Sequence, residues 1–172
     1  MVKIFGALLV ILSCSTIGVY FSSLVRGRVT DLRAMKKNIT ILRGDIKYGN
    51  TTLPEAIGAL SRRNVDNFKE FFAGIEQDLL RSSGLSFQAI WEEGTKNYMK
   101  NSYMNQQDRE QLNQLGENLG YLDKEMQLKT IDFYIEQLDH ELQDSIATMK
   151  EKTRLYNMLG ILSGLFLTVV LI

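Results

Sequence analysis

Two long apolar segments lie at opposite ends of this chain, and they constrain its structure more than any other feature. The first covers residues 4–25 and the second covers residues 155–172, and neither contains a charged residue. A helix needs about 20 apolar residues to cross the hydrocarbon core of a bilayer, with a usual range of about 17–25. The sequence therefore predicts transmembrane helices at residues 1–25 and 155–172, with residues 26–154 as a polar domain between them.

Basic residues beside the two segments predict the orientation of the chain in the membrane. They follow the first segment and precede the second: Arg26, Arg28, Arg33, Lys36 and Lys37, then Lys150, Lys152 and Arg154. On the far sides the only basic residue is Lys3. An excess of Lys and Arg marks the cytoplasmic side of a span. We therefore expect residues 26–154 to be cytoplasmic, with both termini on the opposite side of the membrane.

Two alternatives stay open for the first segment. It has the apolar run of a cleaved signal peptide, although Lys3 gives it only a thin basic region and the run is long for that role. Residues 11–14 also resemble a weak lipoprotein signal, which would lead to acylation of Cys14. The basic cluster after Val25 would impede export of the domain that follows, so an uncleaved span is the preferred prediction.

Between the segments, apolar residues recur at the spacing of amphipathic helices. The first and last stripes consist of Leu32, Met35, Ile39, Leu42 and Ile46, and of Ile131, Ile135, Leu138, Leu142, Ile146 and Met149. Four shorter helices are expected between them, with inner faces at Leu53, Ile57 and Leu60; Phe68, Phe71, Phe72, Ile75 and Leu79; Phe87, Ile90, Trp91 and Tyr98; and Leu112, Leu115 and Leu119. This pattern predicts an all-α fold, an antiparallel six-helix bundle flanked by N- and C-terminal transmembrane helices. The first and last helices should pack together, because both emerge from the same membrane face.

Local signals mark the ends of these helices. Gly49 and Asn50 predict a left-handed cap after the first helix, and Thr52 with Glu55 predicts a capping box before the second. Further boundaries are expected at Asn64, Ser82, Ser83, Gly84, Gly120 and Asp123. No breaker separates the last helix from the second apolar segment, so we expect one continuous rod there. Gly27 weakens a similar continuity in the first helix.

The sequence offers no recognised catalytic pattern. It contains neither a phosphate-binding loop nor a dinucleotide-binding glycine motif. The only histidine is His140, and one histidine without a nearby cysteine is a poor metal-binding set. The formal net charge is zero, which gives no basic face for nucleic acid. We therefore expect no enzyme, no cofactor or metal, no small-molecule substrate and no nucleic-acid partner.

The remaining polar and aromatic residues have simpler interpretations. Carboxylates such as Asp132, Glu136, Asp139 and Asp144, and the pair Glu92 and Glu93, are expected on solvated helix faces. Glu125 and Lys129 have the spacing of a helical ion pair. Phe71, Phe72, Trp91 and Tyr98 are expected in the core. Arg62 and Arg63 are the candidate partner contact, because arginine makes directional contacts with carboxylates.

Three stretches together resemble the stage III sporulation protein AB family. They are the basic helix and turn LRAMKKNITILRGDIKYGNTTLPEAIGAL (residues 32–60), the stretch LGENLGYLDKEMQ (residues 115–127) and the terminal apolar segment. Residues 44–60 also resemble the opening of the cytoplasmic domains of type II secretion platform proteins. Leu53, Ala56 and Ile57 stand where that family has an L-x-x-A-L helix, with isoleucine in place of leucine.

The resemblance implies a role rather than a reaction. It implies a membrane complex that connects the mother cell with the developing forespore, and other stage III sporulation proteins as partners. Its relatives in secretion systems and pili sit above a cytoplasmic hexameric ATPase, which is the further partner implied. Platform proteins usually carry two such domains and more spans, so their rotor mechanism is not expected here. The competing hypothesis is a membrane-anchored sensor or regulator with a ligand pocket in the bundle.

Overall fold

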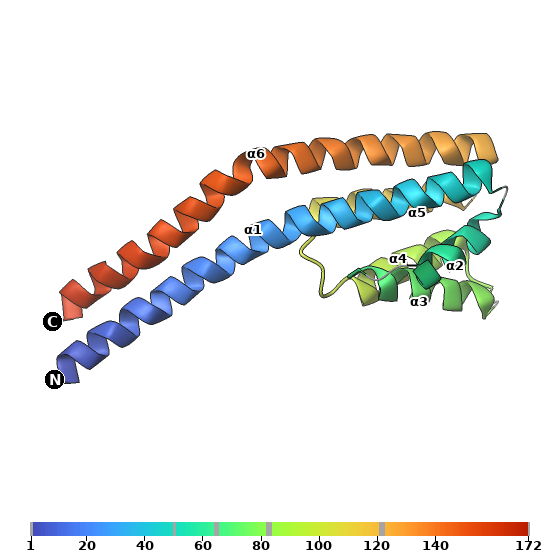
Figure 1. The fold of residues 1–172 in the computed structure, drawn as a ribbon. Helices are drawn as coiled ribbons and strands as arrows, with labels where there is room; N and C mark the ends of the chain where they lie inside the picture. Colours follow the sequence, from blue (N-terminus) through green and yellow to red (C-terminus); the bar gives the residue numbers. More distant parts are fainter. Residues whose placement is uncertain (1, 50, 64–65, 82–83, 121–122, 172) are drawn as a thin grey trace. The chain divides into compact units, whose positions relative to one another are not determined.

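The computed structural model describes residues 1–172 except positions 1, 50, 64–65, 82–83, 121–122 and 172. The described residues form six α-helices and no β-strand, which confirms the predicted all-α fold. In chain order (Figure 1) they are α1 (Val2–Tyr48), α2 (Leu53–Arg63), α3 (Lys69–Leu80), α4 (Phe87–Tyr98), α5 (Gln106–Leu119) and α6 (Lys124–Leu171). Helix α6 is continuous into the second apolar segment, as predicted, and Gly27 does not interrupt α1.

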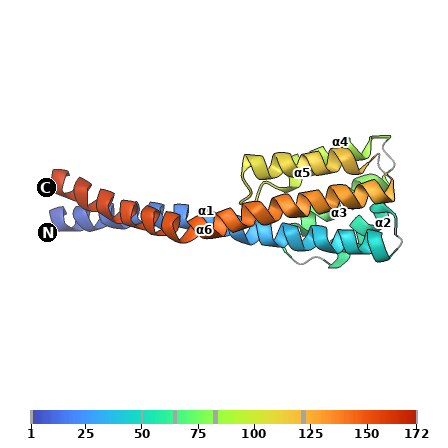
Figure 2. The same cartoon turned by 90° about the horizontal axis from the view of Figure 1, so that it is seen from above.

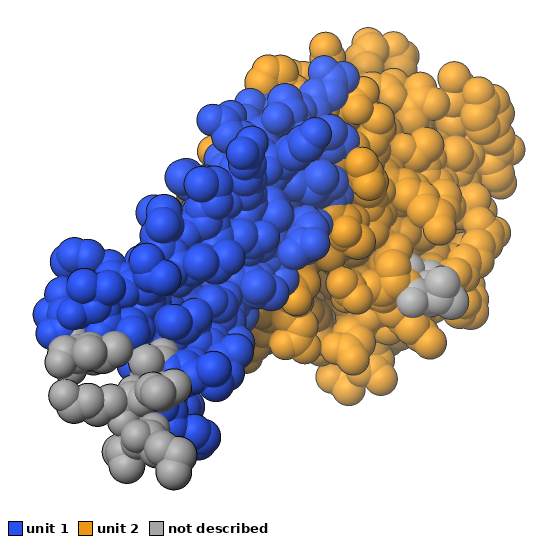
Figure 3. Space-filling model, turned by 60° about the vertical axis from the view of Figure 1, so that its left-hand side comes forward, with its two compact units in different colours: residues 1–29, 143–172 blue, residues 30–142 orange. Residues whose placement is uncertain are grey.

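The helices divide between two compact units (Figure 3). The terminal unit comprises residues 1–29 and 143–172, which belong to α1 and α6. The bundle unit comprises residues 30–142 and contains the rest of α1 and α6 together with all of α2, α3, α4 and α5. Two helices therefore contribute to both units, and four belong to the bundle unit alone.

The core of the bundle unit is built from the apolar stripes that the sequence predicts. Every residue of the α1 stripe, from Leu32 to Ile46, is buried. Phe71 and Trp91 pack edge to face with their ring centroids 5.2 Å apart, and the Trp91 Nε1 donates to the carbonyl of Leu112 at 2.8 Å. Helix α2 packs on α3, α3 on α4 and α4 on α5. Burying one large apolar side chain contributes about 1.5–3 kcal/mol, so these contacts dominate the stability of the unit.

Two of the predicted helix caps are present at least in part. The Asp123 Oδ1 accepts from the amide of Met126 at 2.9 Å, as expected of the cap of α6. The Glu55 carboxylate accepts from the Thr52 amide at 2.9 Å, which is one half of the predicted capping box. That hydrogen bond from the Thr52 backbone lowers the pKa of Glu55. Helix α5 ends before Gly120, as predicted.

The left-handed cap predicted at Gly49 is wrong. Among the described glycines only Gly84 has a positive φ, of 72°. The end of α1 is instead satisfied through the carbonyl of Asp45, which accepts from the Gly49 amide at 2.9 Å and from the Thr51 hydroxyl at 2.8 Å. Because a side-chain hydroxyl supplies the second donor, the backbone does not need to turn left-handed. The accompanying Asn50 lies outside the described residues.

Helix α3 starts later than the sequence signals indicate. It begins at Lys69 with Phe68 as its N-cap, whereas the predicted cap Asn64 lies outside the described residues, as do Ser82 and Ser83. The Asp66 carboxylate accepts from the Phe68 amide at 3.0 Å, and the Asp66 carbonyl accepts from the Lys69 amide at 3.1 Å. Asp66 therefore closes the turn that leads into α3.

Within the bundle unit the apolar stripe of α6 follows its prediction except at Ile135, which is half-buried. Ile131 and Leu138 are buried, but Ile146 is 39% exposed, so its predicted place on the buried stripe is wrong. In the bundle unit α6 contacts α5 as well as α1, as the bond from Gln127 to the Leu119 carbonyl shows, and Tyr134 is buried too. Ile146 belongs to the terminal unit, whose described residues come only from α1 and α6. A helix with one neighbour can bury only a narrow face.

Residues at the ends of the short helices are less buried than their spacing predicts. Leu79 and Phe87 are half-buried. Tyr98 was expected on the inner face of α4 but is 37% exposed, because it is the last residue of that helix. Helical spacing predicts which face a residue takes and carries no information about how far the neighbouring helices extend.

Candidate functional site

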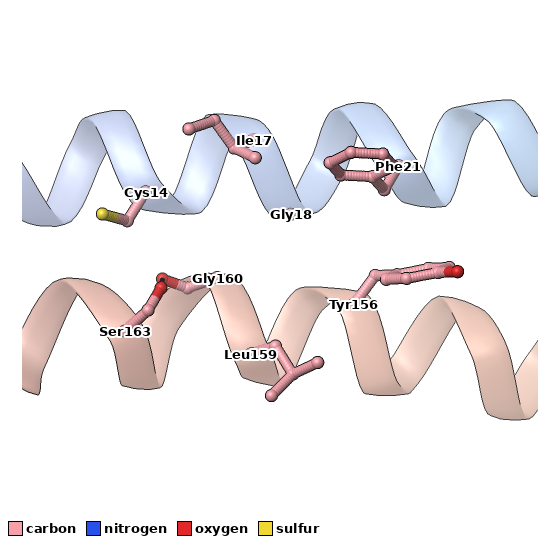
Figure 4. Close-up of a pocket in the computed structure, with 8 residues that line it drawn as sticks. All are labelled: Cys14, Ile17, Gly18, Phe21, Tyr156, Leu159, Gly160 and Ser163. Carbon is pink, nitrogen blue, oxygen red and sulfur yellow. Dashed lines mark hydrogen bonds between the residues drawn. The ribbon is translucent and has the colours of Figure 1, made fainter.

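The two apolar segments pack against each other in the terminal unit through glycine residues (Figure 4). A Cβ added to Gly160 would lie 2.8 Å from the carbonyl oxygen of Cys14 and 3.0 Å from the Cα of Gly18. A Cβ added to Gly164 would lie 3.0 Å from the Cα of Ile11. The two backbones therefore touch, and the pairing of early residues in α1 with late residues in α6 makes them antiparallel. Small residues that let helices approach closely are typical of helix pairs in membranes.

Polar side chains continue this helix contact beyond the glycines. The Ser22 hydroxyl is buried and lies 2.7 Å from the Asn157 Oδ1 and 3.1 Å from the Thr153 carbonyl oxygen. The Arg28 guanidinium donates to the Ser145 hydroxyl at 2.8 Å. Each of these contacts joins α1 to α6 inside the terminal unit. Together with the glycines they fix the register of the two helices.

A pocket of about 370 Å³ lies beside the glycine contact. Its lining residues, drawn in Figure 4, are Cys14, Ile17, Gly18, Phe21, Tyr156, Leu159, Gly160 and Ser163. Phe21 and Tyr156 contact each other with their ring centroids 5.7 Å apart. Cys14 is a half-buried free thiol at the helix contact.

The two apolar segments of the terminal unit have an apolar outer surface. Large exposed side chains cover it, including Phe5, Leu8, Leu12, Leu162, Phe166 and Val169. Among the described residues, the helices Leu8–Tyr48 and Lys124–Val170 are long and apolar enough to cross a membrane. Only 11% of the apolar window of each is buried, unlike the core helix of a soluble protein. A continuous exposed apolar surface of this kind favours a membrane protein.

In the bundle unit, α1 and α6 are joined by ion pairs and run side by side (Figure 2). The Lys36 Nζ lies 2.7 Å from the Asp139 Oδ1, and the Arg43 guanidinium forms two hydrogen bonds with the Asp132 carboxylate. The hydrogen bond from Arg43 lowers the pKa of Asp132. Asp132 and Asp139 therefore hold two helices together rather than only facing solvent. The predicted packing of the first helix on the last is confirmed within each unit.

The structure also tests the predictions made for the other carboxylates. The Glu125 carboxylate lies 2.9 Å from the Lys129 Nζ, which confirms the predicted helical pair, and this hydrogen bond raises the pKa of Lys129. Glu92, Glu93, Glu136 and Asp144 are exposed, as expected of a solvated face.

Arg62 and Arg63 lie at the end of α2 and contact different helices. The Arg62 guanidinium lies 2.6 Å from the Glu76 Oε1 on α3, and the Arg63 guanidinium lies 3.0 Å from the Asp45 Oδ2 on α1. Their side chains are 67% and 61% exposed. The structure thus places both arginines on the surface of the bundle unit, each already paired with a carboxylate, and does not direct them at one common acceptor.

The described residues contain no group of three or more His, Cys, Asp or Glu side chains that could hold a metal ion. His140 is exposed on α6, as its position between two acidic residues predicts. Phe71, Phe72 and Trp91 are buried, which confirms their assignment to the core.

A buried carboxylate on α1 was not predicted from the sequence. Asp31 on α1 is 1% exposed. It accepts hydrogen bonds from the Asn67 amide group at 3.1 Å, from the Ser102 hydroxyl at 2.9 Å and from the backbone amide of Tyr103 at 2.6 Å. A carboxylate in the interior requires such donors. The sequence carried one indication of this burial: Asp31 lies one helical turn before Met35, on the core-facing side of α1.

Comparison with known proteins agrees with this architecture. The chain matches the family model for stage III sporulation protein AB over residues 3–172. It is 24% identical over 171 residues to stage III sporulation protein AB of Bacillus subtilis (strain 168), and the match covers 99% of each chain. A solved structure of stage III sporulation protein AB (SpoIIIAB) has the same fold, with a TM-score of 0.65, 23% identity, and coverage of 72% of this chain and 97% of that chain. The chain therefore belongs to the stage III sporulation protein AB family.

Proposed function

We propose that this chain is a non-enzymatic membrane scaffold in a secretion-like complex that links the mother cell and the forespore during sporulation. The observation that carries the proposal is that α1 and α6, which open and close the bundle unit, are also the helices with membrane-length apolar segments. A helical domain tethered by its first and last helices can act by presenting a surface. Family membership supports the sporulation role, and the resemblance to secretion platform proteins supports coupling to a cytoplasmic ATPase.

The proposal includes a membrane topology. Residues 1–25 and 155–172 are the spans, and residues 26–154 form the cytoplasmic domain on the mother-cell side, with both termini across the membrane. The basic residues that flank each segment on its inner side support this orientation.

The direct test is crosslinking of the full-length protein in sporulating cells, followed by identification of its neighbours. The expected neighbours are a cytoplasmic ATPase and other stage III sporulation proteins. A complete deletion of the gene should block spore formation. Normal sporulation of the deletion strain would remove the scaffold proposal.

Arg62 and Arg63 remain our proposed contact with the ATPase. Each guanidinium has five N–H donors, so the pairs with Glu76 and Asp45 leave donors for a partner carboxylate. Changing both arginines to Gln should reduce crosslinking to the ATPase and lower spore yield. Changing Glu76 to Gln together with Asp45 to Asn removes the same internal pairs and keeps the arginines.

The matched control is Arg81→Gln. Arg81 is 66% exposed and also pairs with a carboxylate, Asp78 at 3.4 Å. Crosslinking that falls equally in the Arg81 variant would refute a specific role for Arg62 and Arg63. A loss seen with the Glu76 and Asp45 variants as well would assign the effect to folding of the bundle.

A second candidate function, a membrane-anchored sensor, is favoured by one observation. The bundle unit contains a pocket of about 460 Å³. Pockets for small ligands are mostly apolar with a few polar groups, whereas charged and amide side chains line most of this one. The scaffold proposal therefore takes precedence.

A further inference from the structure

That pocket of about 460 Å³ lies where the residues before α3 meet the end of α4. Two carboxylates, two phenol rings, one amine and side-chain amides line it. The lining residues include Asp66, Asn67, Lys69, Glu70, Tyr98 and Tyr103. All of them belong to the bundle unit.

The walls of this pocket are held in place from behind. The ring of Tyr98 rests on α3 at Gly74, where an added Cβ would come within 2.6 Å of the ring atom Cζ. The buried Asp31 carboxylate accepts from the Tyr103 backbone amide at 2.6 Å and from the Asn67 side chain at 3.1 Å. These contacts hold the Tyr98 ring, the Tyr103 backbone and the Asn67 side chain in place before any partner binds, which lowers the entropic cost of ordering them on binding.

The exposed parts of the walls favour a cation. Tyr98 and Tyr103 are 37% and 45% exposed, and the face of an aromatic ring attracts a positive charge. Among the described residues, Glu70 has no hydrogen bond or ion pair. Its carboxylate is available to a charged donor, and charge-assisted hydrogen bonds of this kind are the strong ones.

Two features of the pocket would favour an anion instead. Lys69 carries a positive charge, and the first turn of α3 presents the positive end of the helix dipole. The carboxylates of Asp66 and Glu70 lie in or beside the same turn and outnumber that amine. The net charge of the lining is therefore negative.

We propose that this pocket binds an arginine side chain presented by a protein partner. A planar guanidinium can stack on a tyrosine ring and bond a carboxylate through two donors at once, which a lysine ammonium cannot do. The claim that the partner is a protein rests on the proposed scaffold function, whereas binding of the guanidinium rests only on the pocket.

The test is NMR of the full chain in detergent micelles, with ¹³C-labelled tyrosine. N-acetyl-arginine methylamide is the probe, and its citrulline analogue is the neutral isostere. The arginine probe should shift the Tyr98 and Tyr103 signals saturably, and the citrulline probe should not. Glu70→Gln should weaken the arginine probe about tenfold, whereas Glu92→Gln, which removes an exposed carboxylate of α4 outside the pocket, should not. Tyr103→Leu should also weaken binding.

Each contrary result has a defined meaning. The proposal is overturned by the absence of saturable shifts, by equal shifts with citrulline, by no effect of Glu70→Gln or by competition from inorganic phosphate. Unchanged melting of the Glu70 variant, which alters an exposed side chain, keeps the comparison interpretable. Arginine binding combined with failure of the sporulation experiments would remove the scaffold function and leave the site. Failed binding with normal crosslinking would do the reverse.

Discussion

The two units of this protein bury different kinds of side chain. The buried described residues of the terminal unit are all small: Gly18, Ser22, Val29, Ser145, Gly160 and Gly164. The bundle unit buries its largest side chains, including Trp91, Tyr134, Phe68, Phe71 and Phe72. One chain, and in part the same two helices, thus uses two modes of packing.

Under the proposed membrane topology, the surrounding solvent accounts for this difference at Gly18, Ser22, Gly160 and Gly164, which lie in the two apolar segments. In water, the removal of large apolar side chains from solvent drives helices together. In lipid, the acyl chains are as apolar as leucine, so helices associate through close backbone contact and hydrogen bonds instead. The glycine contact of Gly18 with Gly160 and the hydrogen bonds of Ser22 have the second character. The aromatic core around Trp91 has the first.

The largest expected effect tests whether the bundle unit lies in the cytoplasm and whether the two apolar segments cross the membrane. A reporter that is active only in the cytoplasm should be inactive when fused after Ile172. The same reporter should be active when inserted between Ser83 and Gly84, in the connection between α3 and α4. The reverse pattern of activity would contradict the proposed orientation, and activity at both positions would contradict the assignment of the two apolar segments to lipid.

The next effect tests the core of the bundle unit. Leu138 is 1% exposed, so Leu138→Ala should destabilise the folded protein by about 2–5 kcal/mol through lost burial and a new cavity. Ile146→Ala on the same helix is the control, because Ile146 is already 39% exposed. Denaturant unfolding of the full chain in micelles measures both. Equal losses in the two variants would mean that α6 buries the same face throughout.

A smaller effect is expected from the glycine contact. Gly160→Leu should force the two apolar helices apart, at a cost of about 1–3 kcal/mol for overpacking. Electron paramagnetic resonance between labels at positions 17 and 159, with Cys14→Ser, should show a longer separation. Gly6→Leu is the control, since a Cβ at Gly6 meets nothing within 4 Å. An unchanged separation in the Gly160 variant would show that the helices pair through other residues.

The smallest effect is expected from the ion pair of Arg43 with Asp132. Their side chains are 28% and 49% exposed, and exposed pairs contribute at most about 1 kcal/mol. Because Arg43 lowers the pKa of Asp132, this stability is present above the unfolded pKa of about 3.9. It is lost as the pH falls through the lower folded value.

The corresponding variant is Asp132→Asn. It should be slightly less stable than the parent at pH 7 and should approach the parent at about pH 2, because protonation of the Asp132 carboxyl in the parent removes the negative charge that the variant lacks. Urea unfolding at the two pH values measures the difference. A difference that persists in acid would assign the effect to packing rather than to charge.

Local patterns in the sequence were sufficient for much of the bundle unit. The stripe from Leu32 to Ile46 could be identified because helical spacing repeats every 3.6 residues whatever the partner is. The caps at Glu55 and Asp123 depend on residues within one turn of each helix start. The two membrane-length segments follow from length and composition alone.

Only the tertiary structure decided which residues meet across the chain. Asp31 is buried because Asn67, Ser102 and Tyr103 supply its donors, and these residues are distant in sequence. Arg62 and Arg63 look alike in the sequence, yet they pair with carboxylates on different helices. Ile146 is exposed because its unit offers α6 a single neighbour. Periodicity fixes the face on which a residue lies, whereas its burial and its partner depend on which other helices reach that face.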